Sequence, residues 1–313
     1  MPTKPPTDLF DRDISKALVR EKIDLASPLI QEVVNYGVAA FLRCLTTGKP
    51  RDEKLAILMP YFHLLEMVDG IEILLAQAAP FPAQLQLRSA FEALLTIEYI
   101  VETDTVRRAY AYLVAGIHRR LASYYAMDPN TREGKHRKER ITADKYVGDV
   151  RIPDIPGIEA GIANLEGILQ KPGWREADVE YGELKKRLGR RPSWYQLYGG
   201  PQNLERLATH VGGPACYDIL YREWSEMTHV EGSIYQLFMT GEEVEPVMRR
   251  VRDPSEFDTV VALAVTFALR ATRLILGFFR AEELPAFGSW YVREVRETFL
   301  RFLGPGSQED AIL

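Results

Sequence analysis

The stretch Leu85–Ile100, LQLRSAFEALLTIEYI, decides the fold class of this chain of 313 residues. Placed on a helix, its apolar side chains point in nearly every direction, which is typical of a helix buried on all sides. The rest of the chain contains no convincing run of alternating apolar and polar residues and no hairpin signal. We therefore expect this helix to lie at the centre of an all-α protein.

Helical periodicity continues on both sides of this stretch. From Asp8 to Ala79 apolar residues recur at intervals of three and four, as on one face of a helix. Ser27 before Pro28 predicts an N-cap and a helix start, and Pro50 with the acidic residues after it predicts another. The remaining pattern predicts helices over Arg51–Ala79 with a possible kink at Pro60, Pro82–Val101, Asp104–Ala126, Ala215–Ser233, Ser255–Glu283 and Ala286–Phe302.

The middle third of the chain differs in composition, because it is richer in glycine, proline and charge. Such a stretch predicts short helices and loops. We therefore predict a single helical bundle with an insertion. An N-terminal helical block covers residues 1–126, the basic, Gly/Pro-rich insertion covers 127–212, a C-terminal block at 213–303 completes the bundle, and 304–313 form a tail.

Composition excludes several classes of protein. With 44 acidic and 39 basic residues the net charge is −5, which argues against a surface coated in positive charge for bulk DNA binding. Two cysteines are too few for a disulfide framework or a four-cysteine zinc site. The polar N-terminus lacks a secretion signal, and the apolar run Val260–Phe279 contains Arg270 and Arg273. We expect a cytoplasmic protein with no membrane span, and we predict no cofactor.

The segment Tyr221–His229, YREWSEMTH, carries the most informative polar residues. On a helix, Arg222 and His229 differ by only about 20° in direction and about 10.5 Å in height. Ser225 and Glu226 fall on the same face. A fixed cation, an imidazole and a hydroxyl group in one line can hold a phosphate and move a proton near neutral pH. A row of polar residues on one face is also what the solvent-exposed side of an ordinary surface helix shows.

Arg88, Glu92 and Tyr99 align along the apolar stretch Leu85–Ile100. A charged pair on such a helix costs desolvation free energy unless other groups satisfy it. Two interpretations stay open. The pair is a structural salt bridge, or it faces the same polar cleft as Arg222 and His229 and orients them.

Together these motifs resemble a known family. An R-S-x-F-E helix (Arg88 to Glu92) followed by a Y-R-x-x-S-x-x-x-H helix (Tyr221 to His229) resembles a bacterial family of all-helical proteins catalogued only as a domain of unknown function. The resemblance covers most of Pro50–Gly241. The spacing from Arg222 to His229 is also similar to the R-x(4–6)-H signature of HEPN domains, helical bundles that are often ribonucleases of toxin and antiviral systems.

The HEPN resemblance implies a metal-independent ribonuclease site formed across a homodimer. Arg222 would bind the scissile phosphate and His229 would act as acid or base. The positioning groups would be Tyr221, Ser225, Glu226, Arg88 and Glu92. The partners implied are RNA or a nucleotide, a second copy of the chain, and a protein encoded by a neighbouring gene, in a bacterial stress or phage-defence setting.

Two basic clusters in the insertion suit an RNA ligand. Basic groups interleaved with aromatic residues can hold a phosphate backbone and stack bases. Trp194, Tyr195 and Tyr198 follow the second cluster closely. A solvated loop would carry the same charges. The candidate RNA-binding residues are Lys135, Arg137, Lys138 and Arg140 in the first cluster, and Lys186, Arg187, Arg190 and Arg191 in the second.

Two other functions compete with RNA cleavage. Glu133 with His136 and Glu226 with His229 are E-x-x-H pairs. Ferritin-like bundles bind two metal ions with two such pairs and one further glutamate from each of two other helices. In this chain Glu66 and Glu92 are the candidates for those further glutamates. The charge and the internal glycine of the first pair make it a poor candidate for a bundle core, so we predict no metal site. The other alternative is a non-catalytic helical binding or scaffold protein. We expect the remaining histidines, His63, His118 and His210, to be structural.

Overall fold

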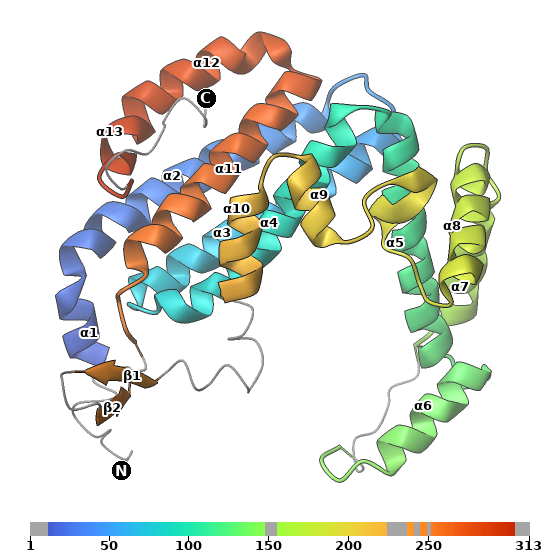
Figure 1. Cartoon of the computed structure of the whole chain (residues 1–313). Coiled ribbons are helices and arrows are strands. Elements are labelled where there is room, and N and C mark those ends of the chain that lie inside the picture. The colour runs from blue at the N-terminus through green and yellow to red at the C-terminus, as the bar shows by residue number, and fades with distance from the viewer. Residues whose placement is uncertain (1–11, 148–154, 224–236, 241–244, 249–251, 304–313) are drawn as a thin grey trace. The chain divides into compact units, whose positions relative to one another are not determined.

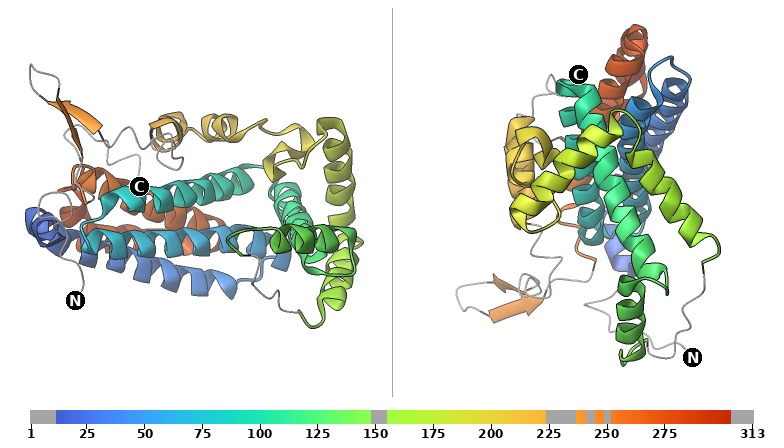
Figure 2. Two further views of the ribbon diagram at one scale, coloured as in Figure 1. Left: turned by 90° about the horizontal axis from the view of Figure 1, so that it is seen from below. Right: turned by 90° about the vertical axis from the view of Figure 1, so that its right-hand side faces the viewer.

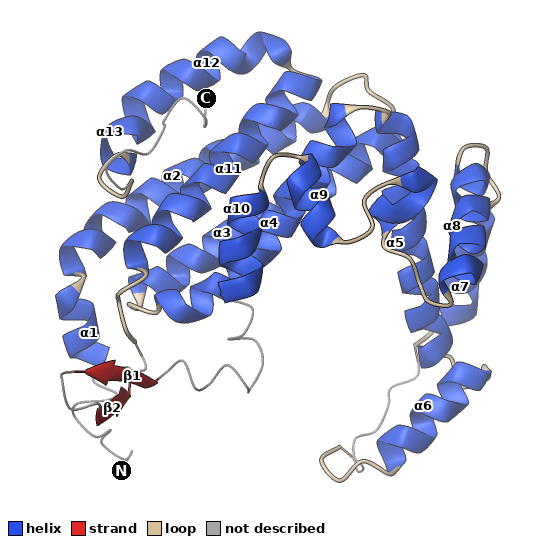
Figure 3. Cartoon of the chain, viewed as in Figure 1, coloured by secondary structure: helices blue, strands red, loops and turns tan. Residues whose placement is uncertain are grey.

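The computed structural model describes residues 12–147, 155–223, 237–240, 245–248 and 252–303. Helices dominate these residues, so the all-α prediction is confirmed (Figures 1 and 3). The longer helices are α2 (Arg20–Leu45), α3 (Arg51–Ala76), α4 (Pro80–Glu102), α5 (Thr105–Met127), α6 (Arg132–Thr142), α7 (Ile158–Leu169), α8 (Trp174–Leu188) and α11 (Phe257–Phe279). The shorter ones are α1 (Arg12–Leu18), η1 (Trp194–Gly199), α9 (Leu204–His210), α10 (Pro214–Tyr217), η2 (Asp218–Glu223), η5 (Ala281–Glu283), α12 (Leu284–Trp290), η6 (Tyr291–Val295) and α13 (Arg296–Phe299).

The described residues form two compact units. The first takes its residues from 1–103 and 207–313, and the second from 104–206. These divisions differ from the boundaries at 126 and 212 that composition suggests. The reason is α5, which packs against α6, α7, α8 and η1 of the middle segment and so belongs with them.

In the first unit α2, α3, α4 and α11 pack side by side, as both views of Figure 2 show. Every residue from Ala93 to Ile100 of α4 is buried. The second half of the apolar stretch Leu85–Ile100 is therefore buried, as its sequence predicts. Earlier along the same helix Leu85 and Glu92 are exposed, so the burial is complete only in the second half.

The apolar helix α11 lies within this bundle. Both α2 and α11 are long and apolar enough to cross a membrane by length and composition. The apolar residues of α11, such as Val265, Leu269 and Ile275, are buried against α2, α3 and α4. Arg270 and Arg273 lie outside that buried set. The packing is that of a core helix with two arginines beside its apolar face.

Pro28 does not start a helix, which corrects the prediction at that position. The helix α2 runs through Pro28 from Arg20 to Leu45. A proline inside a helix removes one backbone hydrogen bond. Here Ala26, Leu29 and Ile30 are buried on both sides of it, and this packing outweighs the local penalty. The Ser27 hydroxyl is not an N-cap but donates a hydrogen bond to Glu72 of α3.

A short antiparallel hairpin is present although the sequence shows no signal for one. Strand β1 (Leu237–Thr240) pairs with β2 (Glu245–Met248), with Leu237 opposite Met248 and Thr240 opposite Glu245. Each strand has four residues. Alternation over so few positions gives no usable pattern. The sheet is not central to the fold, as expected.

Candidate functional site

The two motifs of the family resemblance meet in the first unit. The π-helical segment η2 contacts α4. The Tyr221 hydroxyl of η2 donates a hydrogen bond to the Glu92 carboxylate of α4. The Arg88 guanidinium, one turn earlier on α4, lies 4.3 Å from the centroid of the Tyr221 ring. Three residues singled out from the sequence are thus in direct contact. We call Arg88, Glu92 and Tyr221 the α4–η2 cluster.

A second tyrosine supports this cluster. Tyr217 lies four residues before Tyr221, at the end of α10. The two rings stack with centroids 5.0 Å apart and planes 2° apart. Tyr221 therefore contacts both Tyr217 and Arg88 through its ring and Glu92 through its hydroxyl group. Tyr217 is not among the residues predicted from the motifs, although its spacing of one helical turn from Tyr221 is a signal that could have identified it.

The surroundings of Glu92 disfavour its charged form. Part of the side chain reaches solvent, yet the protein packed around the carboxyl group desolvates it and raises its pKa. The neighbouring Arg88 charge lowers the pKa and so opposes the shift, without cancelling it. A carboxyl group in this setting takes up a proton more readily than an ordinary surface glutamate.

Arg222 follows Tyr221 directly in η2, so its backbone lies at the cluster. Ser225, Glu226 and His229 lie outside the described residues. The structure thus brings the R-S-x-F-E motif to the start of the Y-R-x-x-S-x-x-x-H motif, through Arg88, Glu92 and Tyr221.

Further along α4, a row of ionisable residues continues past the α4–η2 cluster. The guanidinium of Arg270 pairs with Glu98, which is 9% exposed. His210 Nε2 lies 2.8 Å from Glu102 Oε2, and its ring meets Tyr99 edge-on. Tyr99 thus contacts α9. These pairs join residues more than one hundred positions apart, and helical spacing cannot predict them.

The basic residues lie in the second unit, described by itself. Lys135, Lys138 and Arg140 are exposed on α6, and Arg137 is half-buried. Lys186 and Arg187 are exposed at the end of α8, and Arg190 and Arg191 are exposed beyond it. Every predicted RNA-binding residue is therefore at or near the surface.

The aromatic residues near the second basic cluster differ in exposure. Trp194 is buried and packs edge-on against Tyr112, with ring centroids 5.4 Å apart. It is a core residue and not a stacking platform. Tyr198 is exposed, with a left-handed backbone (φ 58°) and the Arg107 guanidinium 5.2 Å from its ring. Of the three aromatic residues, Tyr198 has the most exposed side chain.

The three histidines expected to be structural, His63, His118 and His210, have protein partners. His63 Nε2 lies 2.8 Å from Ser89 Oγ. His118 Nε2 lies 2.6 Å from Asp178 Oδ1, and its ring stacks on Tyr181. Glu133 and His136 lie exposed on α6. Within the part of the chain that the structure describes, no group of three or more His, Cys, Asp and Glu side chains gathers as metal ligands would.

Comparison with known protein families gives a match. The model of a family of unknown function, DUF5677, matches residues 55–245. That range contains both motifs and the whole of the second unit. No curated protein and no solved structure matches the chain.

Proposed function

The chain belongs to DUF5677, a family of unknown function, and we propose that it is a cytoplasmic, metal-independent endoribonuclease of bacterial stress or phage defence. Its reaction centre is built from Arg222 and His229, with the α4–η2 cluster as support. The supporting observation is the contact of Tyr221 with both Arg88 and Glu92, which joins the two motifs. The HEPN-like spacing of Arg222 and His229 is the reason for proposing RNA cleavage as the reaction.

The reaction needs only the groups that these residues carry. The 2′-hydroxyl oxygen of one nucleotide attacks the adjacent phosphorus while the bond from phosphorus to the 5′-oxygen breaks. The neutral imidazole of His229 accepts the proton of the attacking hydroxyl, and an imidazolium returns a proton to the leaving oxygen. The Arg222 guanidinium stabilises the negative charge on the phosphorane. The products are a 2′,3′-cyclic phosphate and a 5′-hydroxyl group.

The α4–η2 cluster has a positioning role in this proposal. The cation–π contact and the tyrosine–carboxylate hydrogen bond fix the turn of η2 that contains Tyr221 against α4. Arg222 extends from that turn, so its backbone is held in place by its neighbour. Ser225 and Glu226 follow in the same motif and complete the proposed set.

Exposed cations of the second unit supply RNA affinity. Each basic cluster contributes four residues at or near the surface, with Tyr198 exposed beside the second. Such groups bind the phosphate backbone without regard to sequence. A homodimer would bring His229 of the partner subunit to the same site, so that one imidazole acts as base and the other as acid.

Cleavage of mixed RNA in EDTA tests the proposal. We expect the wild-type protein to cleave and Arg222→Ala and His229→Ala to lose more than a hundredfold in rate. Arg293→Ala, at an exposed arginine of η6, is the matched control and should cleave normally. Absence of cleavage by the wild type, alone or with the product of a neighbouring gene, would leave the non-catalytic binding function in its place.

A further inference from the structure

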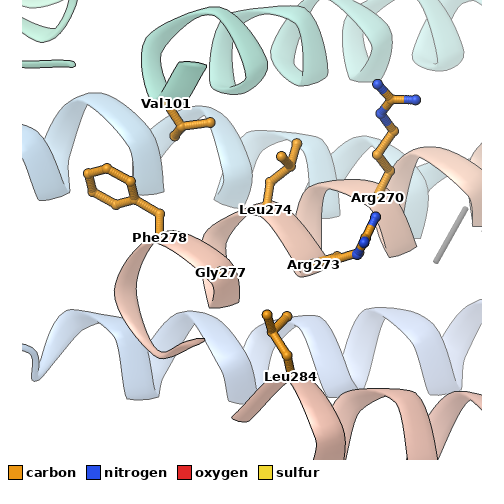
Figure 4. A pocket seen from close by; sticks show the side chains of 7 residues that line it. All are labelled: Val101, Arg270, Arg273, Leu274, Gly277, Phe278 and Leu284. Carbon is orange, nitrogen blue, oxygen red and sulfur yellow. The ribbon is translucent and has the colours of Figure 1, made fainter. Parts of the chain in front are cut away.

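A pocket of about 500 Å³ opens in the first unit, beside the end of α4. Its walls come from α4, α11 and α12. The lining residues are Val101, Arg270, Arg273, Leu274, Gly277, Phe278 and Leu284 (Figure 4). This volume is in the range of pockets that enclose small molecules. None of these residues belongs to the proposed ribonuclease centre.

The pocket is divided by chemistry. Val101, Leu274 and Phe278 present apolar side chains to it, and Leu284 adds another from α12. The side chains of Arg270 and Arg273 both lie at the end away from Phe278 (Figure 4). An occupant that matches these walls has an apolar body and one charged end.

The charge balance at the arginine end sets the charge of the ligand. Arg270 pairs with the largely buried Glu98, which offsets its charge and holds it in place. Arg273 is exposed, and it forms no ion pair with another described residue. None of the described residues that line the pocket is acidic. At this end of the pocket the positive charge of Arg273 is therefore not neutralised by a described residue. A ligand with one negative charge would neutralise it, whereas a phosphate dianion would bring one negative charge too many.

We propose that this pocket binds an amphiphilic monocarboxylate, with the carboxylate on Arg273 and Arg270 and the hydrocarbon chain along Leu274, Leu284 and Phe278. A guanidinium binds a carboxylate through two parallel hydrogen bonds. The apolar walls remove the chain from water. The site is separate from the proposed ribonuclease centre and does not depend on RNA cleavage.

Gly277 offers a way to block the pocket without disturbing the helix. A Cβ atom added at Gly277 would meet no atom within 4 Å, so a larger side chain can enter open space there. Gly70 of α3 is also inside a helix with no atom within that distance, and it does not line the pocket. Gly70→Leu is therefore the matched control for Gly277→Leu.

Calorimetric titration of the full chain with decanoate, below its micelle concentration, tests the proposal. We expect saturable binding by the wild type and by Gly70→Leu, and at least tenfold weaker binding by Gly277→Leu and Arg273→Gln. Lys49→Gln removes the ammonium group that lies 4.5 Å from the Phe278 ring, at the apolar end, and should bind nearly as the wild type does. Decanol should bind at least tenfold more weakly than decanoate.

Three results would overturn the proposal. They are no saturable binding of decanoate, equal binding of decanoate and decanol, and binding that Gly277→Leu leaves unchanged. Thermal melts of each variant show whether it is folded. If Gly277→Leu or Arg273→Gln does not fold, Leu274→Gln, which places an amide on the apolar wall, provides the same comparison.

Discussion

The Tyr221 hydroxyl group donates a hydrogen bond to the Glu92 carboxylate, joining residues 129 positions apart. The same tyrosine ring lies under the Arg88 guanidinium. A single side chain of η2 therefore contacts both Arg88 and Glu92 of α4. If Arg222 and His229 form the ribonuclease centre, changes at Tyr221 should lower the rate of RNA cleavage even where the helical bundle stays folded.

Tyr221→Phe should keep the stacking on Tyr217 and Arg88 and lose only the hydrogen bond. We expect unfolding to become easier by about 1 kcal/mol, the usual size for one hydrogen bond. Tyr221→Ala also removes the cation–π contact, so the loss should reach about 2–3 kcal/mol. Chemical denaturation measures both values. Equal losses for the two variants would mean that the ring contributes nothing.

Glu92→Gln should change the pH dependence of stability. Because desolvation raises the pKa of Glu92, against the opposing effect of Arg88, the folded state favours the neutral carboxyl group. The stability linked to that proton is present at low pH and is lost as the pH rises through the folded-state pKa. The amide cannot ionise, so the melting temperature of Glu92→Gln relative to wild type should increase between pH 4 and pH 7. A constant or decreasing difference would show that the charged form is not disfavoured.

The sequence predicts the bundle well because its helices obey local rules. The buried second half of α4 and the bounds of α3, α5 and α11 follow within a few residues from apolar periodicity. The error at Pro28 has a different origin, since tertiary burial of Leu29 and Ile30 outweighs a local helix-start signal. The membership of α5 in the second unit depends on its packing against later helices, which composition does not show.

The candidate site is predictable only in part. Helical spacing identified Arg88 and Glu92 as a charged pair needing partners, and the family motif added Tyr221, which contacts both. The pairing of Glu98 with Arg270 joins residues 172 positions apart and has no sequence signal. The exposure of Tyr198 and the burial of Trp194 likewise depend on how η1 packs on α5.

Replacing the basic residues of either cluster by glutamine should weaken RNA binding. It should also make the affinity for RNA less dependent on salt concentration. We expect the slope of log affinity against log salt to fall by about 0.7 for each phosphate of a single strand that the protein no longer neutralises. Lys135, Arg137, Lys138 and Arg140 changed together to Gln test the first cluster by fluorescence anisotropy. Arg293 and Arg301, exposed arginines of the first unit, changed to Gln serve as the control. An unchanged slope in the cluster variant would exclude α6 from RNA contact.

Gly134→Ala should disturb the first cluster without changing its charge. A Cβ atom at Gly134 would lie 1.8 Å from the backbone oxygen of Asp128, so the first turn of α6 must move. We expect reduced helix content and weaker RNA binding than in Gly182→Ala, where α8 leaves open space for a Cβ. Circular dichroism and anisotropy check these outcomes. Equal helix content and equal RNA affinity of the two variants would mean that α6 does not need the close contact between Gly134 and the backbone of Asp128.

Analysis of the cleavage products of a short RNA tests most directly whether the protein cleaves RNA by attack of the 2′-hydroxyl group. The substrate is cleaved in EDTA, and the same RNA with a single 2′-deoxynucleotide at the cleaved position is treated in parallel. We predict 2′,3′-cyclic phosphate and 5′-hydroxyl ends, with no cleavage at the deoxy position and none by His229→Ala. Ends with a 3′-hydroxyl and a 5′-phosphate, or cleavage that survives the 2′-deoxy substitution, would contradict the account.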